Sequence, residues 1–368
     1  MFPKSLKINK LIINRFRNIK NISYSPASKL NIFQGSNAQG KTNILEAILV
    51  NATGSSFRSG TYDDFIEVNK DSFTIQITYK IDDRDFTSNL SYYKKQGKIF
   101  KINQQKQPHQ HPERLRVVIF TPDDLYLVKG TPKKRRNFLD FALRQISPQF
   151  NADIEKYTKI LKKRNLLLKR DQAYTKTFNI INEIFVEKAA SIIIARINYV
   201  NLLDQAAQIV QKSINDQVED LKIRYALSFP VENGKINMEI LRDMLKKQLE
   251  MIGKEEDEKK KTMVGPHLDD INIYLNSQPA RIYASQGQQR NIAVTLKLAE
   301  LFAFRKIMGF YPVLLLDEVL AELDRPKKDM LIKYLSNAHF QTFLTSVNID
   351  SKNLPGIKIS TVNQGRLE

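Results

Sequence analysis

The sequence predicts an α/β fold, a mixed β-sheet with helices, interrupted by a helical insertion. A glycine-rich turn at residues 35–42 lies between a short apolar run and an amphipathic helical pattern. A second apolar run, residues 313–316, ends in two carboxylates, which is typical of a central parallel strand at a ligand site. Between these segments, residues 149–229 contain neither proline nor glycine, which favours long helices.

The glycine-rich turn is a GxxxxGKT phosphate-binding loop, formed by Gly35, Ser36, Asn37, Ala38, Gln39, Gly40, Lys41 and Thr42. The glycines allow a tight turn in which consecutive backbone N–H groups point at a phosphate, and the following helix adds the positive end of its dipole. Lys41 can reach the β- and γ-phosphates, and the Thr42 hydroxyl can ligate Mg²⁺. We therefore expect ATP and Mg²⁺ as cofactors. Arg17 and Asn18 are expected to help hold the nucleotide or close the loop over it.

The composition indicates a globular protein with a polyanionic partner. The chain has 368 residues, long enough for two domains or for one domain with a large insertion. Its 58 basic and 39 acidic residues give a formal charge of +19, which favours a nucleic acid or a membrane surface as partner. The absence of cysteine excludes disulfides and thiolate metal sites. Because no run approaches the length of a membrane span or a signal peptide, we expect a cytoplasmic protein.

Several segments before the insertion have the sequence patterns of strands. Residues 6–13 predict a strand at or near a sheet edge. Alternating patterns over residues 73–81 and 86–92, with a further short strand ending at Ile102, predict an antiparallel sheet appended to the parallel one. Residues 115–120 predict another buried strand. We therefore assign residues 1–122 and 260–368 to the α/β head and residues 123–259 to the inserted helical lobe.

The insertion is expected to pack as antiparallel helices in a coiled-coil-like manner. The apolar residues that recur at sevens, and those on the adjoining positions, are Phe185, Ile192, Tyr199 and Ala206, and Ala195, Leu202 and Ile209. Residues 223–229 alternate as one strand. Residues 241–252 predict a charged helix, and residues 254–261 predict a solvated, mobile linker.

Two basic segments of the insertion are candidates for contact with DNA phosphates. The first is a turn and the second lies on a helix; their candidate residues are Lys133, Lys134, Arg135 and Arg136, and Lys162, Lys163 and Arg164. A solvated helix face is an equal alternative for the second segment. Backbone contacts would give a steep salt dependence without base readout.

The second half of the expected active site lies after the insertion. Ser285, Gln286, Gly287 and Gln288 open a helix whose N-terminus is another anion-receptive surface. At the end of the apolar strand, Asp317 would hold Mg²⁺, usually through water, and Glu318 would orient and deprotonate the attacking water. Residues 321–324 form a turn, and residues 341–346 read as a last buried strand with hydroxyls at its end.

The order of these motifs resembles the ATP-binding-cassette (ABC) heads of SMC and Rad50 proteins, and the whole chain resembles the RecF family of bacterial recombination mediators. The residues that carry the closer resemblance are 16–18, 35–42, 120–125, 129–130 with 135–136, 265–267, and 285–290. The resemblance implies a P-loop ABC-type ATPase head with an inserted helical lobe. It also makes Asp123 equivalent to a Q-loop residue, makes Asp324 a D-loop residue, and places the 285–288 signature on the γ-phosphate held by a second copy.

The same resemblance implies a DNA-repair function. Such a protein would dimerise with ATP, bind double-stranded, gapped or junction DNA, and hydrolyse ATP slowly under stimulation by DNA. With RecO and RecR it would load RecA during repair, replication restart and the SOS response. Leu268 stands where the family usually has arginine, and Glu318 replaces the commoner second aspartate. Thr345 and Ser346 offer no histidine where transporters carry one, which predicts slow turnover.

Three other ABC-type functions are alternatives. A transporter ATPase lacks an insertion of this size between loop and signature, and it would leave the net charge unexplained. A chromosome-organising SMC-like protein would need a coiled coil of hundreds of residues. A cassette-linked nuclease would need a cluster of metal-binding acids after residue 317, whereas beyond Asp329 the only acids are Asp350 and Glu368.

Overall fold

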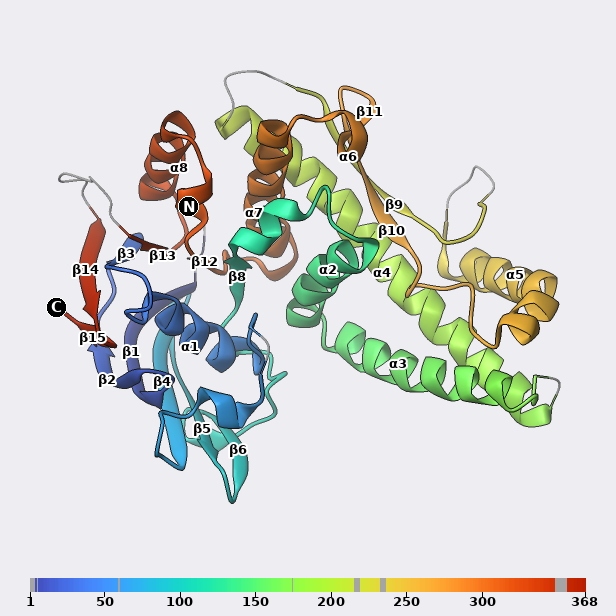
Figure 1. Cartoon of the computed structure of the whole chain (residues 1–368), viewed down its shortest axis with the longest axis horizontal. Helices are drawn as coiled ribbons and strands as arrows, with labels where there is room; N and C mark the ends of the chain where they lie inside the picture. The colour runs from blue at the N-terminus through green and yellow to red at the C-terminus, as the bar shows by residue number, and fades with distance from the viewer. Residues whose placement is uncertain are drawn as a thin grey trace. The chain divides into compact units, whose positions relative to one another are not determined.

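The computed structural model describes residues 4, 6–58, 60–173, 175–214, 219–231, 236–347 and 356–368. The chain divides into two compact units (Figure 1). Unit 1 comprises Met1–Leu125, Lys212–Asp216 and Ala293–Glu368, and unit 2 comprises Tyr126–Gln211 and Gln217–Ile292. Residues 260–292, which we expected in the head, therefore group with unit 2.

Unit 1 contains a six-stranded sheet in the order β15-β14-β3-β13-β12-β8. Its strands are β3 (Leu30–Gln34), β8 (Val117–Phe120), β12 (Val313–Leu316), β13 (Thr342–Ser346), β14 (Ile357–Asn363) and β15 (Arg366–Leu367). All neighbouring pairs are parallel except β14 with β15. The apolar runs predicted around residues 115–120, 313–316 and 341–346 are confirmed as buried strands. The prediction that β13 is the last strand is wrong, because β14 and β15 follow it.

A second sheet of unit 1 is antiparallel, in the order β2-β1-β4-β5-β6-β7. Its strands are β1 (Leu6–Phe16), β2 (Ile19–Tyr24), β4 (Ser72–Ile81), β5 (Arg84–Tyr93), β6 (Gly97–Ile102) and β7 (Gln105–Lys106). In β4 every second residue is buried, as the alternating pattern predicts. The appended antiparallel sheet is therefore confirmed.

Helix α1 (Lys41–Thr53) contacts strands of both sheets, including β4 and β13 (Figure 1). Because sheet strands contact it from two sides, residues 44–52 are buried without interruption. This burial fixes the helix that carries the phosphate-binding loop. The remaining short helices of unit 1 are η1 (Tyr62–Phe65), η3 (Val319–Glu322) and α8 (Arg325–Asn337), while η2 (Pro122–Tyr126) and α7 (Gln286–Met308) run across the division between the units.

Unit 2 is mainly helical, but it also carries a three-stranded antiparallel sheet. Its helices are α2 (Pro132–Ile146), α3 (Pro148–Lys169), α4 (Lys176–Ile214, of which the last turn belongs to unit 1), α5 (Met238–Lys259) and α6 (Ala280–Tyr283). The sheet has the order β11-β10-β9, formed by β9 (Leu221–Ala226), β10 (Asp270–Leu275) and β11 (Gln278–Pro279). The helical lobe of the prediction is present, while the strand expected over residues 223–229 ends at Ala226.

The seven-residue repeat of α4 is confirmed in part. Phe185, Ile192, Tyr199 and Ala206 are all buried. The adjoining set that we expected beside them is not, because Ile209 is 58% exposed and the other two are half-buried. The buried neighbours are instead Val186, Ile193, Val200 and Ala207. In α4, therefore, the residue that directly follows each member of the repeat is buried, and not the residue three positions after it.

Two local predictions about the insertion are wrong. The basic segment at residues 133–136 is the first turn of α2, because Thr131 accepts a hydrogen bond from the Lys134 backbone N–H and Pro132 occupies the first helical position. The expected linker at residues 254–261 continues α5 to Lys259. There the buried Glu256 pairs with the buried Arg164 of α3, and this pair ties the two helices together.

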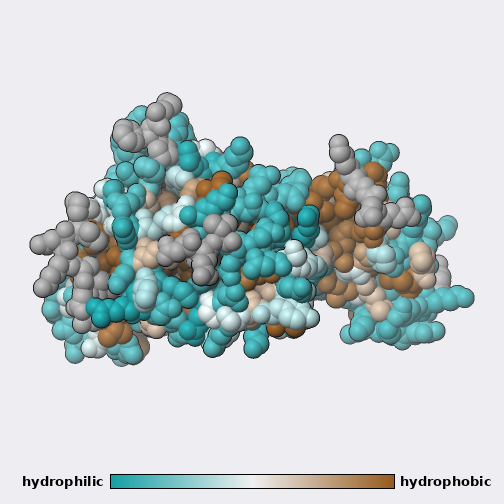
Figure 2. Space-filling view, turned by 90° about the horizontal axis from the view of Figure 1, so that it is seen from above, coloured by the Kyte–Doolittle hydropathy of each residue, from teal (hydrophilic) through white to brown (hydrophobic). Residues whose placement is uncertain are grey.

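Polar residues dominate the surface, as the composition requires. On the face shown in Figure 2 most residues are hydrophilic, and hydrophobic residues gather in smaller areas. No helix in the described part of the chain is both long and apolar enough to cross a membrane.

Replacing Arg164 should destabilise unit 2. The Arg164→Ala variant leaves the Glu256 carboxylate buried without its guanidinium partner, a loss that costs about 3 kcal/mol of unfolding free energy. Urea unfolding followed by circular dichroism measures this loss. The matched control is the exposed neighbour Lys163→Ala, which should change stability by less than about 0.5 kcal/mol. Equal effects of the two variants would contradict this prediction.

Candidate nucleotide-binding site

The phosphate-binding loop connects β3 to α1 through two glycines in conformations that other residues rarely adopt. Gly35 has φ of 150° and Gly40 has φ of 109°. A Cβ at Gly35 would lie 2.5 Å from the Val362 carbonyl oxygen, and one at Gly40 would lie 2.6 Å from Asn18 Oδ1. Glycine is therefore required at residue 35 by the backbone that approaches it as well as by φ, and at residue 40 chiefly by φ.

The far side of the loop is held by residues from both ends of unit 1. The Gln364 backbone N–H donates to Gln39 Oε1 at 2.7 Å, and the Gly365 N–H donates to the Gln39 carbonyl at 2.8 Å. Asn18 Nδ2 donates to the same carbonyl at 3.2 Å. Asn18 thus closes on the loop. The short β14–β15 hairpin, which the sequence analysis did not include, is a second support of the loop.

Lys41 is folded into the loop that precedes it. Its Nζ donates to the carbonyls of Gly35 at 2.8 Å and Ser36 at 3.0 Å, and it lies 3.3 Å from Glu318 Oε1. The Lys41 side chain is only 2% exposed. The ammonium group therefore lies where it can meet a phosphate bound by the loop N–H groups. Glu318 faces it from the end of residues 313–318, the Walker B segment.

Asp317 joins three adjacent strands at their carboxyl ends. Its Oδ1 accepts hydrogen bonds from Thr42 Oγ1 at 2.8 Å and Thr345 Oγ1 at 2.9 Å. Thr42 follows β3, Thr345 lies on β13 and Asp317 ends β12, and these strands are consecutive in the sheet. Burial raises the pKa of Asp317, and the two hydroxyl donors oppose this shift. The sequence marks Thr345 as a hydroxyl residue at the end of a buried strand, but its contact with Asp317 depends on the strand order, which local patterns do not give.

Glu318 has a left-handed backbone conformation that is unusual for its residue type. Its φ is 51°, and its backbone N–H donates to Thr345 Oγ1 at 2.8 Å. A non-glycine residue in this region costs about 1 kcal/mol or more and persists only where its surroundings enforce it. The turn directs the Glu318 carboxylate toward Lys41, and its side chain keeps 38% exposure.

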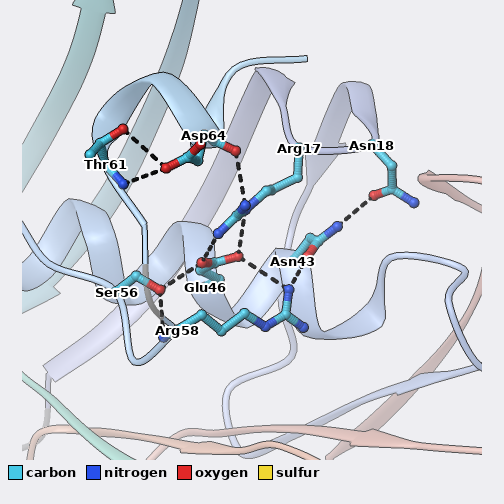
Figure 3. Close-up of polar contacts among 8 residues, drawn as sticks. All are labelled: Arg17, Asn18, Asn43, Glu46, Ser56, Arg58, Thr61 and Asp64. Carbon is cyan, nitrogen blue, oxygen red and sulfur yellow. Dashed lines mark hydrogen bonds and ion pairs between the residues drawn. The ribbon is translucent and has the colours of Figure 1, made fainter. Parts of the chain in front are cut away.

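The buried carboxylate of Glu46, on α1, lies at the centre of the polar contacts drawn in Figure 3. Glu46 is fully buried and accepts from Arg17 Nε at 3.1 Å, Arg17 Nη2 at 2.8 Å and Ser56 Oγ at 2.6 Å. Arg17 Nη1 also donates to the Asp64 carbonyl at 2.9 Å. Arg17 therefore braces α1 and the 54–64 segment, and its hydrogen bonds go to protein groups rather than toward the loop.

Arg58 is a cation of the site that the motif analysis missed. Its Nη1 donates to Asn43 Oδ1 at 2.8 Å and reaches Glu46 Oε2 at 3.5 Å, while Asn43 in turn donates to Asn18 (Figure 3). The positive charge of Arg58 also acts to lower the pKa of Asp317. No spacing rule marks Arg58, and its only signal in the sequence is a basic residue within the glycine-bounded turn after α1.

The remaining predicted residues of unit 1 lie at turns. Asp123 is exposed on η2, directly after β8, while its neighbour Asp124 accepts hydrogen bonds from the N–H and hydroxyl of Thr121. Asp324 caps α8 and accepts from the Lys327 backbone N–H at 3.0 Å, which holds the pKa of Asp324 below its usual value. Their Q-loop and D-loop roles stay predictions.

The signature lies in unit 2 at the N-terminus of α7. Ser285 Oγ accepts from the Gln288 backbone N–H at 3.2 Å, and Gln288 Oε1 accepts from the Ser285 N–H at 2.9 Å, a reciprocal capping box. Gln286 is exposed and Gly287 is half-buried. Gln288 Nε2 donates to Glu219 at 2.7 Å, so its amide is already engaged within the chain.

The structure divides the candidate DNA-contacting residues. Arg135 and Arg164 are wrong as candidates, because both are buried and paired with carboxylates, Arg135 with Asp270 and Arg164 with Glu256. Arg136 is half-buried and donates to the Asp269 carbonyl at 2.6 Å. The residues that stay on the surface are Lys133, Lys162 and Lys163, which are exposed, and Lys134, which is half-buried.

The fold and the site together define an ABC-type ATPase head with a P-loop. A model of the family described as the RecF/RecN/SMC N-terminal domain matches residues 7–356. A protein of Enterococcus faecalis, described as DNA replication and repair protein RecF, is 35% identical over 373 residues, which cover 99% of each chain. The chain therefore belongs to this domain family and, within it, to the RecF family.

Solved structures agree with this placement. A structure described as the recombination mediator protein RecF with ATP in the RecFOR pathway is 29% identical, has a TM-score of 0.88, and covers 100% of this chain and 98% of its own. An Smc head domain from Pyrococcus furiosus is 16% identical with a TM-score of 0.53, covering 99% of this chain and 95% of its own. The second likeness supports the fold alone.

The Asp317→Asn variant should gain thermal stability and lose its response to Mg·ATP. Because burial raises the pKa of Asp317, the ionised carboxylate at neutral pH destabilises the folded protein, and a neutral amide still accepts from Thr42 and Thr345. With ATP at 100 times its dissociation constant, the parent should gain about 2.7 kcal/mol. Differential scanning fluorimetry with and without Mg·ATP measures both effects. Asp324→Asn, at an exposed helix cap, is the control and should respond like the parent.

Proposed function

We propose that this protein is an ATP-dependent, dimerising DNA-binding protein that acts as a recombination mediator. The observation that carries the proposal is the convergence of the phosphate-binding loop, Asp317 and Glu318 at one edge of the parallel sheet, on a chain of the RecF family. A signature segment at a helix N-terminus supplies a second anion-receptive surface.

The donor set of this edge fits Mg²⁺. A carboxylate and two hydroxyls converge within hydrogen-bonding distance, and hard oxygen ligands of this kind suit Mg²⁺ when phosphates complete its coordination. No cluster of three or more potential metal-binding side chains occurs among the residues that the structure describes, so an all-protein metal cage is not formed there. Thr42 and Asp317, the latter through water, would hold the ion, which would neutralise charge on the β- and γ-phosphates.

ATP hydrolysis would be slow and would act as a switch. Glu318 is the general base in this proposal, because it ends the Walker B segment, is partly exposed and faces Lys41. Thr345 lies near the end of the neighbouring strand β13, where transporters carry a histidine, and its hydroxyl is committed to Asp317 and to the Glu318 backbone. Lys41 and Arg58 provide positive charge beside the phosphates.

A second copy would complete the site. The phosphate-binding loop of one copy and Ser285, Gln286, Gly287 and Gln288 of the other would bind opposite sides of the same nucleotide. Ligands shared between two chains stabilise only the dimer, and loss of the γ-phosphate removes part of that contact. Hydrolysis would therefore release the dimer. The engagement of Gln288 by Glu219 means that a conformational change of this amide would accompany γ-phosphate contact.

The outer face of α3 is the best-supported contact for DNA. Its exposed cations are Lys156, Lys159, Lys162, Lys163 and Lys169 of the helix, and Arg170 at its C-cap. None of them takes part in an ion pair within the described part of the chain. From Lys156 to Lys169 the helix rises about 20 Å, and these cations lie on the side opposite the buried Tyr157 and Leu168. A continuous row of unpaired cations suits the phosphate backbone of double-stranded or gapped DNA.

The pathway assignment comes from family membership. A RecF structure is described within the RecFOR pathway, and we propose RecO and RecR as partners of this chain, with RecA loading as the outcome during repair, replication restart and SOS induction. The site of action would be the cytoplasm, where DNA is reached without crossing a membrane.

Sedimentation of the Glu318→Gln variant tests the proposed ATP-dependent, DNA-binding dimer. This variant should bind ATP without turning it over, and it should sediment as a dimer with ATP and as a monomer with ADP or without nucleotide. A gapped duplex should co-sediment with the ATP-bound dimer at low salt and dissociate at high salt. A protein that stays monomeric with ATP and ignores DNA would contradict the proposal and favour another ABC-type function.

Neutralising part of α3 should weaken DNA binding in a salt-dependent way. Each phosphate contact contributes about 0.9 to the slope of log affinity against log salt, so the Lys156→Gln, Lys159→Gln, Lys163→Gln triple variant should lower that slope by about 2 to 3. Fluorescence anisotropy of a labelled duplex over a salt series measures it. The matched control neutralises Lys7, Lys10 and Lys20, exposed residues of β1 and β2 in unit 1, and should leave the slope near that of the parent.

A further inference from the structure

The signature is preceded by two exposed apolar side chains on α6. Ile282 is 72% exposed and Tyr283 is 66% exposed. They are the only sequence-adjacent pair among the exposed large apolar residues that the structure describes. Single exposed apolar residues are ordinary on protein surfaces, whereas contiguous ones mark contact surfaces. We call Ile282 and Tyr283 the α6 pair.

The α6 pair is held rigidly by its flanks. Ala280 and Ala284 are buried on either side of it, and the Ala284 backbone N–H donates to the Ala280 carbonyl at 3.2 Å. Gln289 Nε2 donates to the Ala284 carbonyl at 2.9 Å, which ties α6 to the first turn of α7. The pair is therefore presented to a partner without the entropic cost of ordering a loop.

We propose that the α6 pair is the apolar part of the contact with a second copy of this chain. Tyr283 lies two residues before Ser285, a separation of about 7 Å at most. A standard interface covers about 800 Å² per partner, which corresponds to a radius of about 16 Å. If Ser285 reaches the nucleotide of a second copy, the α6 pair must lie inside the same contact. This inference rests on the proposed function, which supplies the second copy.

The surroundings of the pair favour a protein partner over DNA. A recess of about 250 Å³ opens beside Ile282, with a mixed lining that includes the apolar Val128, Ile273 and Pro279 and the charged Asp270 and Arg281. Such a surface accepts apolar side chains among polar ones, whereas a phosphate backbone would contact at most the Tyr283 hydroxyl and would leave Ile282 covered by polar groups. Tyrosine is also among the residue types that contribute most to protein interfaces. In a two-fold dimer the pair is present twice, so each substitution removes its contacts twice.

The test uses the full chain with Glu318→Gln as the parent. Ile282→Ser with Tyr283→Ser should weaken the ATP-dependent dimer at least tenfold in dissociation constant, measured by analytical ultracentrifugation over a concentration series. Binding of a fluorescent ATP analogue at protein concentrations below dimerisation should be unchanged, because neither residue lies at the phosphate-binding loop. Ile282→Leu with Tyr283→Phe keeps the apolar area and should dimerise like the parent.

A control pair separates this effect from a general loss of surface apolarity. Ile180→Ser with Met251→Ser alters residues of α4 and α5 that are 58% and 78% exposed, and it should leave dimerisation unchanged. Parent-like dimerisation of the serine variant at residues 282 and 283 would overturn the inference while leaving the proposed function intact. A parent that fails to dimerise with ATP would overturn both.

Discussion

The structure of unit 1 depends on the two hydroxyl groups that share one oxygen of Asp317. A buried carboxylate is costly unless donors satisfy it, and here the donors are Thr42, in the first turn of α1 after β3, and Thr345, near the end of β13. Together with the backbone pairing of β3, β13 and β12, this requirement holds the carboxyl ends of the three strands at one edge of the sheet. The same oxygens suit a hard cation, so the contacts that satisfy the Asp317 carboxylate also bring together the oxygen ligands expected to hold Mg²⁺.

The phosphate-binding loop beside Asp317 is held in its conformation by residues that are distant in the sequence. Gly35 lies against the carbonyl of Val362, and Gln39 is bound by the turn of the β14–β15 hairpin and by Asn18. A GxxxxGKT segment can bind phosphate in many folds. In this chain the hairpin and the strand before the loop hold it rigid, and Glu46 with Arg17 anchors the helix that follows it.

Local patterns were enough to predict most strands of unit 1, the phosphate-binding loop and the two carboxylates after β12, because these depend on short-range periodicity and on backbone conformations that few residues allow. The contacts of Thr345 and Arg58 do not follow from such patterns. Thr345 matters because β13 lies between β3 and β12, which is a fact of strand order, and Arg58 matters because its side chain extends to Asn43. The grouping of residues 260–292 with unit 2 was not predicted for a similar reason. It depends on the pairing of β10 with β9, two strands that are separated in the sequence by α5.

The roles of the basic residues were the hardest feature of unit 2 to predict. The position of such a residue on its helix decides whether its side chain is exposed to a binding partner or buried in the core. Lys163 and Arg164 are adjacent and both basic, yet the 100° turn between them places one in solvent and the other against Glu256 and Asn182. Arg135 and Lys133 divide in the same way on α2. The buried guanidinium groups of Arg164 and Arg135 pair with carboxylates and thereby tie α3 to α5 and α2 to β10, and the lysines left outside carry the surplus charge available to a polyanion.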